Sequence, residues 1–556
     1  MVILTGSPSA LRAQSTYLSL DEDQYGLIDR YEAKSGRINT QFFTGVKPYK
    51  RQAVVAFFGG LDSLGLLHSR ADRFNREYFA IDSWEFGRPQ ERFSKTTLPW
   101  KMYHAKSDFG HVDTEGFDLH ISPVLYVGYG KDNTLSEPVW QNTRGLELRA
   151  TIDNKVGVYT FISENQAILP GYVQQTLNPY RVIPHETLWK DFNKTGVDFI
   201  NARAHISFRA TRHIDIQFGH DRNFIGNGHR SLILSDHSAP YLFLKANLKV
   251  WKINYQYMLS RLNADIITNN AGTLIRGRYP QKFFAFHEAS INIGKKVNLA
   301  VFESVIFSPK TPNTTDYFDL GYLNPVIFYR SVEQQFGSPD NVMLGFDAKW
   351  VVRKGLTAYS QFVIDEFVVS EILSGKGWWG NKFAAQAGIK AVDLFGIRNL
   401  DLQLEGNLAR PYTYSQSEKY LSYSHYRQPL AHPVGANFRE AVAIVRYQPH
   451  PRVRLSAKAI YYLTGKNDPD NNWGGDILKE NNVNRPRWEG NVIGQGERTT
   501  VLFADLSASW MLRHNLFLDF RQFVRKSESA IASLNTNTSL TAVALRLNIA
   551  KRNYEF

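Results

Sequence analysis

The sequence contains no cysteine among its 556 residues, which excludes a disulfide framework and a thiolate metal site. It also contains no apolar run near the roughly 18 residues of a membrane-spanning helix, so a helical membrane protein is excluded. Its formal charge of +13 is not gathered into one basic patch. Lysines and arginines are scattered singly, which argues against a nucleic-acid partner and fits a surface that faces anionic lipid head groups or acidic glycan.

Aromatic side chains and period-two alternation are abundant instead. Aromatic residues make up 13% of the chain, which is high for a soluble enzyme and typical of the interfacial girdles of membrane barrels. Apolar and polar side chains alternate over 241–248 and again, after a two-residue join, over 250–262. Such alternation indicates half-buried antiparallel strands, and so short a join predicts a hairpin. About ten residues suffice for a tilted strand to cross a bilayer.

The same alternation predicts about eighteen strands along the chain. They are expected at 117–130, 143–152, 156–165, 199–210, 212–219, 241–248, 250–262, 284–293, 297–307, 342–352, 356–367, 382–393, 400–409, 439–447, 453–463, 499–512, 515–525 and 540–549. Their two faces predict which side chains meet lipid and which line the lumen: Leu244, Ile253 and Leu402 outside, and Lys245, Asn254 and Gln403 inside.

The predicted connections alternate between short and long, which is the strongest signal in the sequence. A soluble sandwich also alternates its faces, but nothing forces its loops to alternate in length. Tight periplasmic turns and long external loops are typical of outer-membrane barrels. We therefore predict an all-β protein, a transmembrane antiparallel β-barrel in the outer membrane of a Gram-negative bacterium. Loops 410–438 and 464–498 are expected outside the cell, and the turn 294–296 in the periplasm.

The first part of the chain does not alternate. Apolar residues recur every three or four positions between Ala53 and Phe74, which predicts helices, and Gly59-Gly60 is expected to separate two short ones. We assign 15–115 to a periplasmic helical segment and 116–556 to the barrel; an unrelated soluble helical domain is the alternative for the first. Residues 1–14 read as the remnant of a signal peptide, or else as a disordered start.

Two segments of the barrel region resemble a known family. Residues 219–240 read Gly-His-Asp-Arg-Asn-Phe-Ile-Gly-Asn-Gly-His-Arg-Ser-Leu-Ile-Leu-Ser-Asp-His-Ser-Ala-Pro, and residues 322–333 read Tyr-Leu-Asn-Pro-Val-Ile-Phe-Tyr-Arg-Ser-Val-Glu. Both are similar to the capsule-assembly Wzi family of outer-membrane barrels, in particular to its branch that includes the gliding-motility protein RemB. The resemblance implies an eighteen-stranded barrel with periplasmic helices and, in the capsule branch, a role in holding surface polysaccharide.

These two segments also supply the candidate binding residues. Loops 220–240 and 308–341 contain apolar runs too long to leave in water, so both are expected to fold inward and narrow the lumen. Their aromatic rings would stack on a sugar, while amides and guanidinium groups would bind its hydroxyls or acidic groups. The candidate glycan-binding residues are Arg222, Asn223, Asn227, Tyr322, Asn324, Tyr329, Arg330 and Gln334. A plug whose aromatics merely pack is the alternative.

No catalytic constellation and no cofactor site stands out. The chain lacks a Gly-x-Ser-x-Gly elbow. Asp468, Asp470 and Asn472 have the rhythm of a calcium loop, but Trp473 stands where the glycine belongs, so an Asx-rich turn is the better interpretation. The spacing of His213, His220, His229 and His237 does not match that of zinc ligands, so no metal is expected.

Three functions remain open at this point. The first is a non-enzymatic barrel that anchors or assembles surface polysaccharide or supports surface motility. The second is a structural subunit of a larger outer-membrane complex, and the third is a diffusion porin. The expected partners are outer-membrane lipid and lipopolysaccharide, then surface polysaccharide or other outer-membrane proteins.

Overall fold

The computed structural model describes residues 15–20, 24–95, 102–177, 182–264, 280–307, 320–326, 328–336 and 340–556, without the side chains of 333–336. The expected signal-peptide remnant, 1–14, lies outside the described residues.

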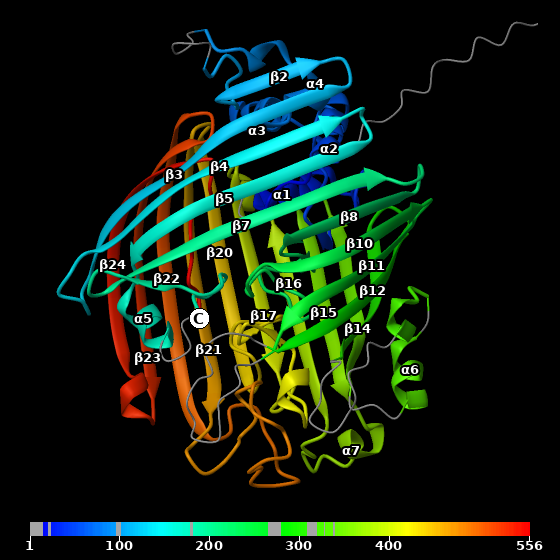
Figure 1. Cartoon of the computed structure of the whole chain (residues 1–556), viewed down its shortest axis with the longest axis vertical. Helices are drawn as coiled ribbons and strands as arrows, with labels where there is room; N and C mark the ends of the chain where they lie inside the picture. The colour runs from blue at the N-terminus through cyan, green and yellow to red at the C-terminus, as the bar shows by residue number, and fades with distance from the viewer. Residues whose placement is uncertain are drawn as a thin grey trace, which may run out of the picture.

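A closed antiparallel barrel of eighteen long strands dominates the described chain (Figure 1). The strands are β3 (Phe117–Asp132), β4 (Val139–Ile152), β5 (Val156–Ile168), β7 (Gly196–Arg209), β8 (Ile214–Asp221), β10 (Tyr241–Val250), β11 (Ile253–Asn263), β12 (Gln281–Ile293), β13 (Val297–Phe307), β14 (Asn341–Arg353), β15 (Leu356–Glu366), β16 (Lys382–Ala391), β17 (Leu400–Ala409), β20 (Phe438–His450), β21 (Val453–Lys466), β22 (Glu497–Arg513), β23 (Leu516–Ser529) and β24 (Thr536–Leu547). Each predicted strand has its counterpart here, so the predicted fold is confirmed.

Strand pairing sets two distinct faces. In the β10–β11 hairpin, Leu244 lies opposite Leu259 and Lys245 opposite Met258. Leu244 is 45% exposed on the outer face, whereas Lys245 is 4% exposed on the inner face. The barrel closes where β24 pairs with β3. The predicted faces are confirmed, because Ile253 is exposed, Leu402 is half-buried, and Asn254 and Gln403 are buried.

The connections differ in length at the two ends of the barrel. Turns such as those between β10 and β11, β14 and β15, and β20 and β21 contain two residues. The other end carries the long loops, among them the one with the short helix α7 (Val369–Leu373), at the bottom of Figure 1. The predicted alternation in length is therefore confirmed.

In the part of the chain that the structure describes, four helices precede the barrel: α1 (Tyr25–Ser35), α2 (Arg51–Ser63), α3 (Arg70–Asp82) and α4 (Trp84–Gly87), followed by the 3-10 turn η1 (Gln90–Arg92). The expected break at Gly59-Gly60 is wrong, because α2 runs through both glycines. They lie on its exposed face, where no side chain is needed, while Phe57, Phe58 and Leu61 continue its buried stripe. None of the described helices is long and apolar enough to cross a membrane.

This helical segment lies at the end with the short turns and reaches into the lumen. The backbone N–H of Ile38 donates to Lys295 of the β12–β13 turn, at 2.8 Å. Further in, Arg30 of α1 pairs with Asp401 and Asp393, and Lys349 of β14 pairs with Glu32. The segment is therefore attached to strands that lie more than 300 residues away along the chain.

Smaller elements complete the described structure. They are β1 (Val46–Lys47), β2 (Gly110–Thr114), α5 (Gly171–Leu177), β6 (Lys190–Phe192), β9 (Phe224–Ile225), η3 (Leu320–Leu323), α6 (Tyr329–Phe336), η4 (Leu394–Gly396), η5 (Lys419–Leu421), β18 (Ser424–His425), β19 (Gln428–Pro429) and η6 (Ala532–Leu534). β2 pairs with the start of β3, and β6 with the start of β7.

Loops from the long-loop end fill the lumen. Loop 220–240 was expected to fold into the barrel, and beyond the end of β8 at Asp221 it does: Leu232, Ile233 and Leu234 belong to an apolar cluster on the inner wall and are at most 1% exposed. Loop 410–438 was expected to be exposed, and that prediction is wrong for most of it. Its Tyr414 and Leu430 belong to the same buried cluster, because three long loops share the burial of their apolar residues inside one barrel.

Candidate functional site

The structure separates the predicted binding residues into two groups on opposite sides of the barrel wall. Arg222, Asn223 and Asn227 lie inside the barrel, where Asn227 donates to Asp347 of β14 at 2.8 Å. Tyr322, Asn324, Tyr329 and Arg330 lie outside it, on the segment that holds η3 and α6 (right side of Figure 1). The side chain of Gln334 lies outside the described atoms. The inward folding predicted for loop 308–341 is therefore wrong for residues 320–326 and 328–336, while residues 308–319 lie outside the described structure.

The η3–α6 segment lies outside the barrel because a row of polar residues interrupts the apolar outer face of the wall. Tyr257, His287 and Glu303 lie opposite one another on β11, β12 and β13, at positions that would otherwise face lipid. The Glu303 carboxylate accepts hydrogen bonds from the backbone N–H groups of Tyr329 and Arg330, at 2.8 and 2.9 Å, at the start of α6. Polar groups cannot be left unsatisfied in lipid, so this row attracts a covering segment.

Aromatic packing completes this cover. The Tyr329 ring stacks on His287 with ring centroids 4.4 Å apart, and Tyr322 donates to Asp340 at 2.7 Å. Both tyrosines are fully buried. Asn324 and Arg330 remain exposed. This half of the predicted site is thus a structural contact whose rings are unavailable for stacking on a sugar. The sequence signal that marks it is the pair His287 and Glu303, which breaks the apolar outer face of two predicted strands.

A different aromatic cluster lies at the long-loop end, and the sequence analysis missed it. Trp378 and Trp379 follow β15, and Arg485 and Trp488 lie in the loop before β22. The Arg485 guanidinium sits 3.7 Å from the ring centroid of Trp379 and 4.4 Å from that of Trp488. We refer to these four residues as the Trp–Arg cluster. Four of the eleven tryptophans of the chain fall in these two loops, and that concentration could have revealed it.

Backbone hydrogen bonds hold the two loops of the Trp–Arg cluster together. The N–H of Trp379 donates to the carbonyl of Trp488 at 2.9 Å, and that of Gly490 donates to Lys376 at 2.7 Å. Trp488 is nevertheless 64% exposed. The Arg485 guanidinium lies over one face of this ring, and the exposed remainder of the ring offers apolar surface next to a guanidinium donor, the combination that a sugar ring and its hydroxyls require.

The neighbouring Asp468 loop is an Asx-type turn. Its carboxylate accepts from the backbone of Asn471 at 2.7 Å and from the indole of Trp473 at 2.7 Å. These contacts confirm the turn predicted there. Among the described residues, no group of three metal-ligating side chains is present.

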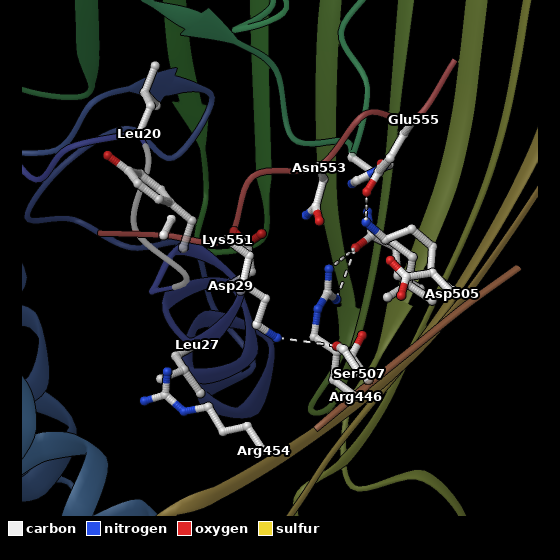
Figure 2. A pocket seen from close by; sticks show the side chains of 18 of the residues that line it. Leu20, Leu27, Asp29, Arg446, Arg454, Asp505, Ser507, Lys551, Asn553 and Glu555 are labelled. Carbon is white, nitrogen blue, oxygen red and sulfur yellow. Dashed lines mark hydrogen bonds and ion pairs between the residues drawn. The ribbon is translucent and has the colours of Figure 1, made fainter. Parts of the chain in front are cut away.

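The second candidate site is a cavity of about 470 Å³ inside the lumen, between the helical segment and the loops that fill the barrel (Figure 2). Its lining comes from α1, from residues 222–237, from β17 and β20–β23, and from residues 549–555. Of the predicted residues, only Arg222 belongs to this lining.

The loop at 222–237 is held in the lumen by polar contacts at its apex. Gly226 has a positive φ of 139°, and a side chain there would collide with the amide nitrogen of Gln361. Shortly after it, the backbone N–H groups of His229 and Arg230 donate to the carboxylate of Glu405 on β17, at 2.6 and 3.0 Å. Glycine is therefore required at 226 for the loop to pass this close to β15.

Residues 549–556 run back through the lumen after β24, in red beside the C-terminal label of Figure 1. Glu555 anchors this segment, since its carboxylate bonds to Lys458 at 2.5 Å and to His229 at 2.8 Å. Tyr172 of α5 donates to the carbonyl of Tyr554 at 2.5 Å. Although burial alone would raise the pKa of the Glu555 carboxyl, Lys458 and His229 hold it well below its usual range.

The charges of the cavity are unequal. Among the described residues that line it are ten arginines and lysines and six carboxylates, an excess of four positive charges. Five of the six carboxylates already form ion pairs: Asp29 with Lys390, Asp401 with Arg30, Asp505 with Arg521, Glu555 with Lys458, and Glu186 with Arg552. Burial would raise the pKa of Asp29, but Lys390 and Lys47 lower it to about 2. Burial lowers the pKa of Lys47 to about 8.

Comparisons with known proteins agree with this architecture. No family model and no curated protein matches the sequence. Among solved structures, the chain is similar to Wzi, an outer-membrane protein involved in group 1 capsule assembly in Escherichia coli and described as a carbohydrate-binding β-barrel. The TM-score is 0.56 at 11% identity, over 97% of this chain and 100% of that one. The fold is that of an outer-membrane β-barrel.

That likeness extends beyond the strands, because a match over 97% of the chain includes helical residues that precede the barrel. A weaker similarity links the chain to OprD from Pseudomonas aeruginosa, with a TM-score of 0.41 at 10% identity over 77% of this chain and 93% of that one. The membership of the RemB branch stays a prediction.

Proposed function

We propose that the protein holds polysaccharide at the cell surface through the Trp–Arg cluster, without enzymatic activity. In this proposal 116–556 span the outer membrane of a Gram-negative bacterium, the long loops are extracellular, and the helical segment 15–115 is periplasmic. Lipid and lipopolysaccharide surround the barrel. The observation that carries the proposal is the exposed Trp488 ring, held beside the Arg485 guanidinium at 4.4 Å.

The filled lumen argues against the porin alternative. Buried clusters from loops 224–240 and 410–437 occupy the barrel, and the helical segment binds the wall at the opposite end. A path for diffusing solutes would have to pass both. The fold similarity to a carbohydrate-binding barrel supports the proposal in general terms. A role in surface motility would use the same exposed loops, which bind polymer in either case.

The test is Trp488→Ala, compared with Trp488→Tyr. Loss of the ring removes the stacking face, which contributes about 0.5–1.5 kcal/mol beyond buried area, so retention of polysaccharide should fall roughly two- to twelvefold. Trp488→Tyr keeps an aromatic ring and should preserve most of the polysaccharide retention. Trp251→Ala is the matched control, because Trp251 is 75% exposed on the short turn at the other end. Heat-modifiable gel migration verifies that each barrel is folded. Unchanged retention in folded Trp488→Ala cells would rule the cluster out.

A docking subunit of a larger outer-membrane complex is the second candidate. The observation in its favour is the apolar outer edge of the η3–α6 segment, where Val326 and Phe328 are 77% and 76% exposed. Purification in mild detergent separates the two candidates. Stoichiometric protein partners that are lost on Phe328→Ala would favour the subunit, whereas co-purifying glycan lost on Trp488→Ala would favour the proposal.

A further inference from the structure

The short turns at one end of the barrel carry a large excess of positive charge. They connect β4 to β5, β7 to β8, β10 to β11, β12 to β13, β14 to β15, β16 to β17, β20 to β21 and β22 to β23, at the end opposite α7 in Figure 1. Within these turns, counted with one flanking residue on each side, ten lysines and arginines are exposed: Lys155, Arg212, Lys252, Lys295, Lys296, Arg353, Lys354, Arg398, Arg452 and Arg513. Asp153 is the one exposed carboxylate among the same residues, all of which the structure describes.

We propose that these basic turns bind anionic phospholipid head groups, such as that of phosphatidylglycerol, around the rim of the barrel that faces the periplasm. The site lies at the end remote from the Trp–Arg cluster. It rests on the orientation given in the proposed function, with the short turns in the periplasm, and is independent of the glycan role. Ammonium and guanidinium groups fit lipid phosphates because both donate several charge-assisted hydrogen bonds to anionic oxygens.

The charge of these turns is not neutralised within the protein. In the described parts of the chain, none of the ten cations forms an ion pair with a carboxylate. Arg212 donates to the ring of His213 at 2.9 Å, which is a contact with a neighbouring side chain of the same turn. In the helical segment beside the turns, the exposed Asp62 pairs with Arg76 of the same segment. The turns therefore present positive charge to whatever surrounds the rim.

The cations lie at the depth where the apolar outer face ends. Ile253 and Ile293 are 43% and 50% exposed on that face, and Lys252 and Lys295 stand one and two residues away from them toward the turn. At roughly 3.3 Å per residue, these lysines begin within about 7 Å of the last lipid-facing side chains. Their long aliphatic stems allow the ammonium groups to reach the head-group layer while the stems stay against apolar surface.

The distribution of the charge favours a lipid leaflet over a single macromolecular partner. The ten cations are spread over all eight short turns, whereas a protein partner would contact one sector of the rim. A polymer that crossed this end would meet the helical segment, which lies across it. The excess is also confined to one end: the long loops 367–381 and 467–496 together contain four lysines and arginines against six carboxylates. A leaflet of anionic head groups surrounds the whole rim and matches this ring.

The test uses the full-length barrel in phosphatidylcholine vesicles. Spin-label electron paramagnetic resonance compares the association of spin-labelled phosphatidylglycerol and spin-labelled phosphatidylcholine with the protein surface. At low ionic strength we expect phosphatidylglycerol to associate at least about twofold more strongly. In about 1 M salt the difference should largely disappear, because the Debye length falls to about 3 Å. Equal association of the two lipids at low ionic strength would overturn the proposal without any variant.

A pair of matched variants locates the effect. The short-turn variant carries four changes: Lys155→Gln, Lys295→Gln, Lys296→Gln and Lys354→Gln. The control removes four exposed lysines near the long-loop end: Lys131→Gln, Lys190→Gln, Lys194→Gln and Lys479→Gln. Since four of the ten charges are lost, the short-turn variant should lose about two-fifths of the preference for phosphatidylglycerol, and the control should keep it. Heat-modifiable migration verifies that both barrels are folded.

Equal losses in the two variants would show that the short turns do not bind the lipid. Binding to isolated peptidoglycan without a preference for phosphatidylglycerol would assign the turns to the cell wall and overturn the proposal as well. Because Trp488→Ala acts at the other end of the barrel, it should leave the lipid preference unchanged. Glycan retention and lipid preference can therefore fail separately.

Discussion

Glu303 shows how a single side chain redirects a whole loop. It points out of the barrel wall, yet it is 5% exposed, because α6 begins directly over it and His287 bonds to it at 3.1 Å. The carboxylate accepts two otherwise unsatisfied N–H groups at the start of a helix, where negative charge is also favoured by the helix dipole. The position of the η3–α6 segment therefore depends on one residue of β13.

Replacing Glu303 by Ala should detach this segment. The change leaves two backbone donors and the His287 ring without their acceptor, and each unsatisfied group costs about 1–3 kcal/mol. We expect protease cleavage within 320–336 to become fast while the strands stay protected, as measured by limited proteolysis and mass spectrometry. Val301→Ala, on the same outer face of β13, should leave the cleavage rate unchanged; cleavage at equal rates in both variants would contradict this role.

Two buried histidines predict a pH dependence of the luminal packing. Burial lowers the pKa of His229, and Lys458 lowers it further; burial and His185 hold the pKa of His237 well below its usual range. In the unfolded chain these two histidines take up protons near pH 6.5, whereas in the folded chain they stay neutral to lower pH. Below about pH 6.5 the unfolded chain therefore holds more protons than the folded chain. Stability contributed by the neutral rings is thus present above about pH 6.5 and lost as the pH falls.

The melting temperature should therefore be lower at pH 5 than at pH 7.5, measured by the loss of heat-modifiable migration. Glu555 and Asp29 do not contribute in this window, because their pKa values are depressed and their effects appear only at more acidic pH. A His229→Gln/His237→Gln variant should show a smaller difference between the two pH values. If its difference equals that of the wild type, other groups set the pH dependence.

At the scale of elements, the strands were predictable because their two environments differ sharply. Period-two alternation records which side of the wall each side chain meets, and all eighteen strands followed from it. The helix α6 could not be predicted by periodicity, because its eight residues sit in a loop and its site is made by β11–β13. The helix break predicted at Gly59-Gly60 was wrong for a related reason. Whether a glycine ends a helix depends on how the opposite face of that helix packs in the folded protein.

The difference between faces predicts a contrast between two arginine substitutions in β10. Leu244→Arg places a charge in lipid and should cost about 2–4 kcal/mol. Asn247→Arg places it on the inner face, opposite Asp215 of β8, and should cost far less. Urea unfolding of the barrel in lipid vesicles measures both. Equal losses would indicate that the outer face does not meet lipid.

Gln403→Arg would be a poor choice for the luminal arginine in this comparison, although Gln403 lies on the inner face. Gln403 is 3% exposed and donates to Tyr359 at 3.0 Å while accepting from Arg446. A luminal arginine would therefore lose two contacts and lie beside another guanidinium. Because the lumen is packed, inward positions near the cavity behave as a protein core.

At the scale of the molecule, the contents of the lumen were only partly predictable. The apolar run at 232–234 correctly indicated burial inside. That residues 410–437 and 549–556 enter the same space was not predictable from the sequence, because it depends on which loops share one enclosed volume. The inward folding predicted for loop 308–341 was wrong in its described residues for the opposite reason: apolar loops can also be buried against the outside of a wall.

A packed lumen predicts a barrel that does not conduct ions steadily in a planar bilayer. Replacing 223–237 by a short Gly-Ser linker removes part of the luminal core together with the contacts to Glu405 and Gln361. We expect discrete conductance steps in that variant and none in the wild type. A linker of the same kind in place of 479–492, in another loop at the long-loop end, should not create them. Steady conductance in the wild type would restore the porin alternative.

The ion pairs of α1 also determine an order of assembly. Asp29, Arg30 and Glu32 are synthesised early, but their partners on β14, β16 and β17 and in the turn between the last two come more than 300 residues later. Until those strands exist, the first helix carries charges without their final counterparts and has no wall to rest on. The helical segment can therefore take its final position only when β14, β16 and β17 have folded into the wall. The returning segment at 549–556 is held by β21 and β23 in the same way, through Lys458 and Arg525, so the barrel wall receives its contents from both ends of the chain.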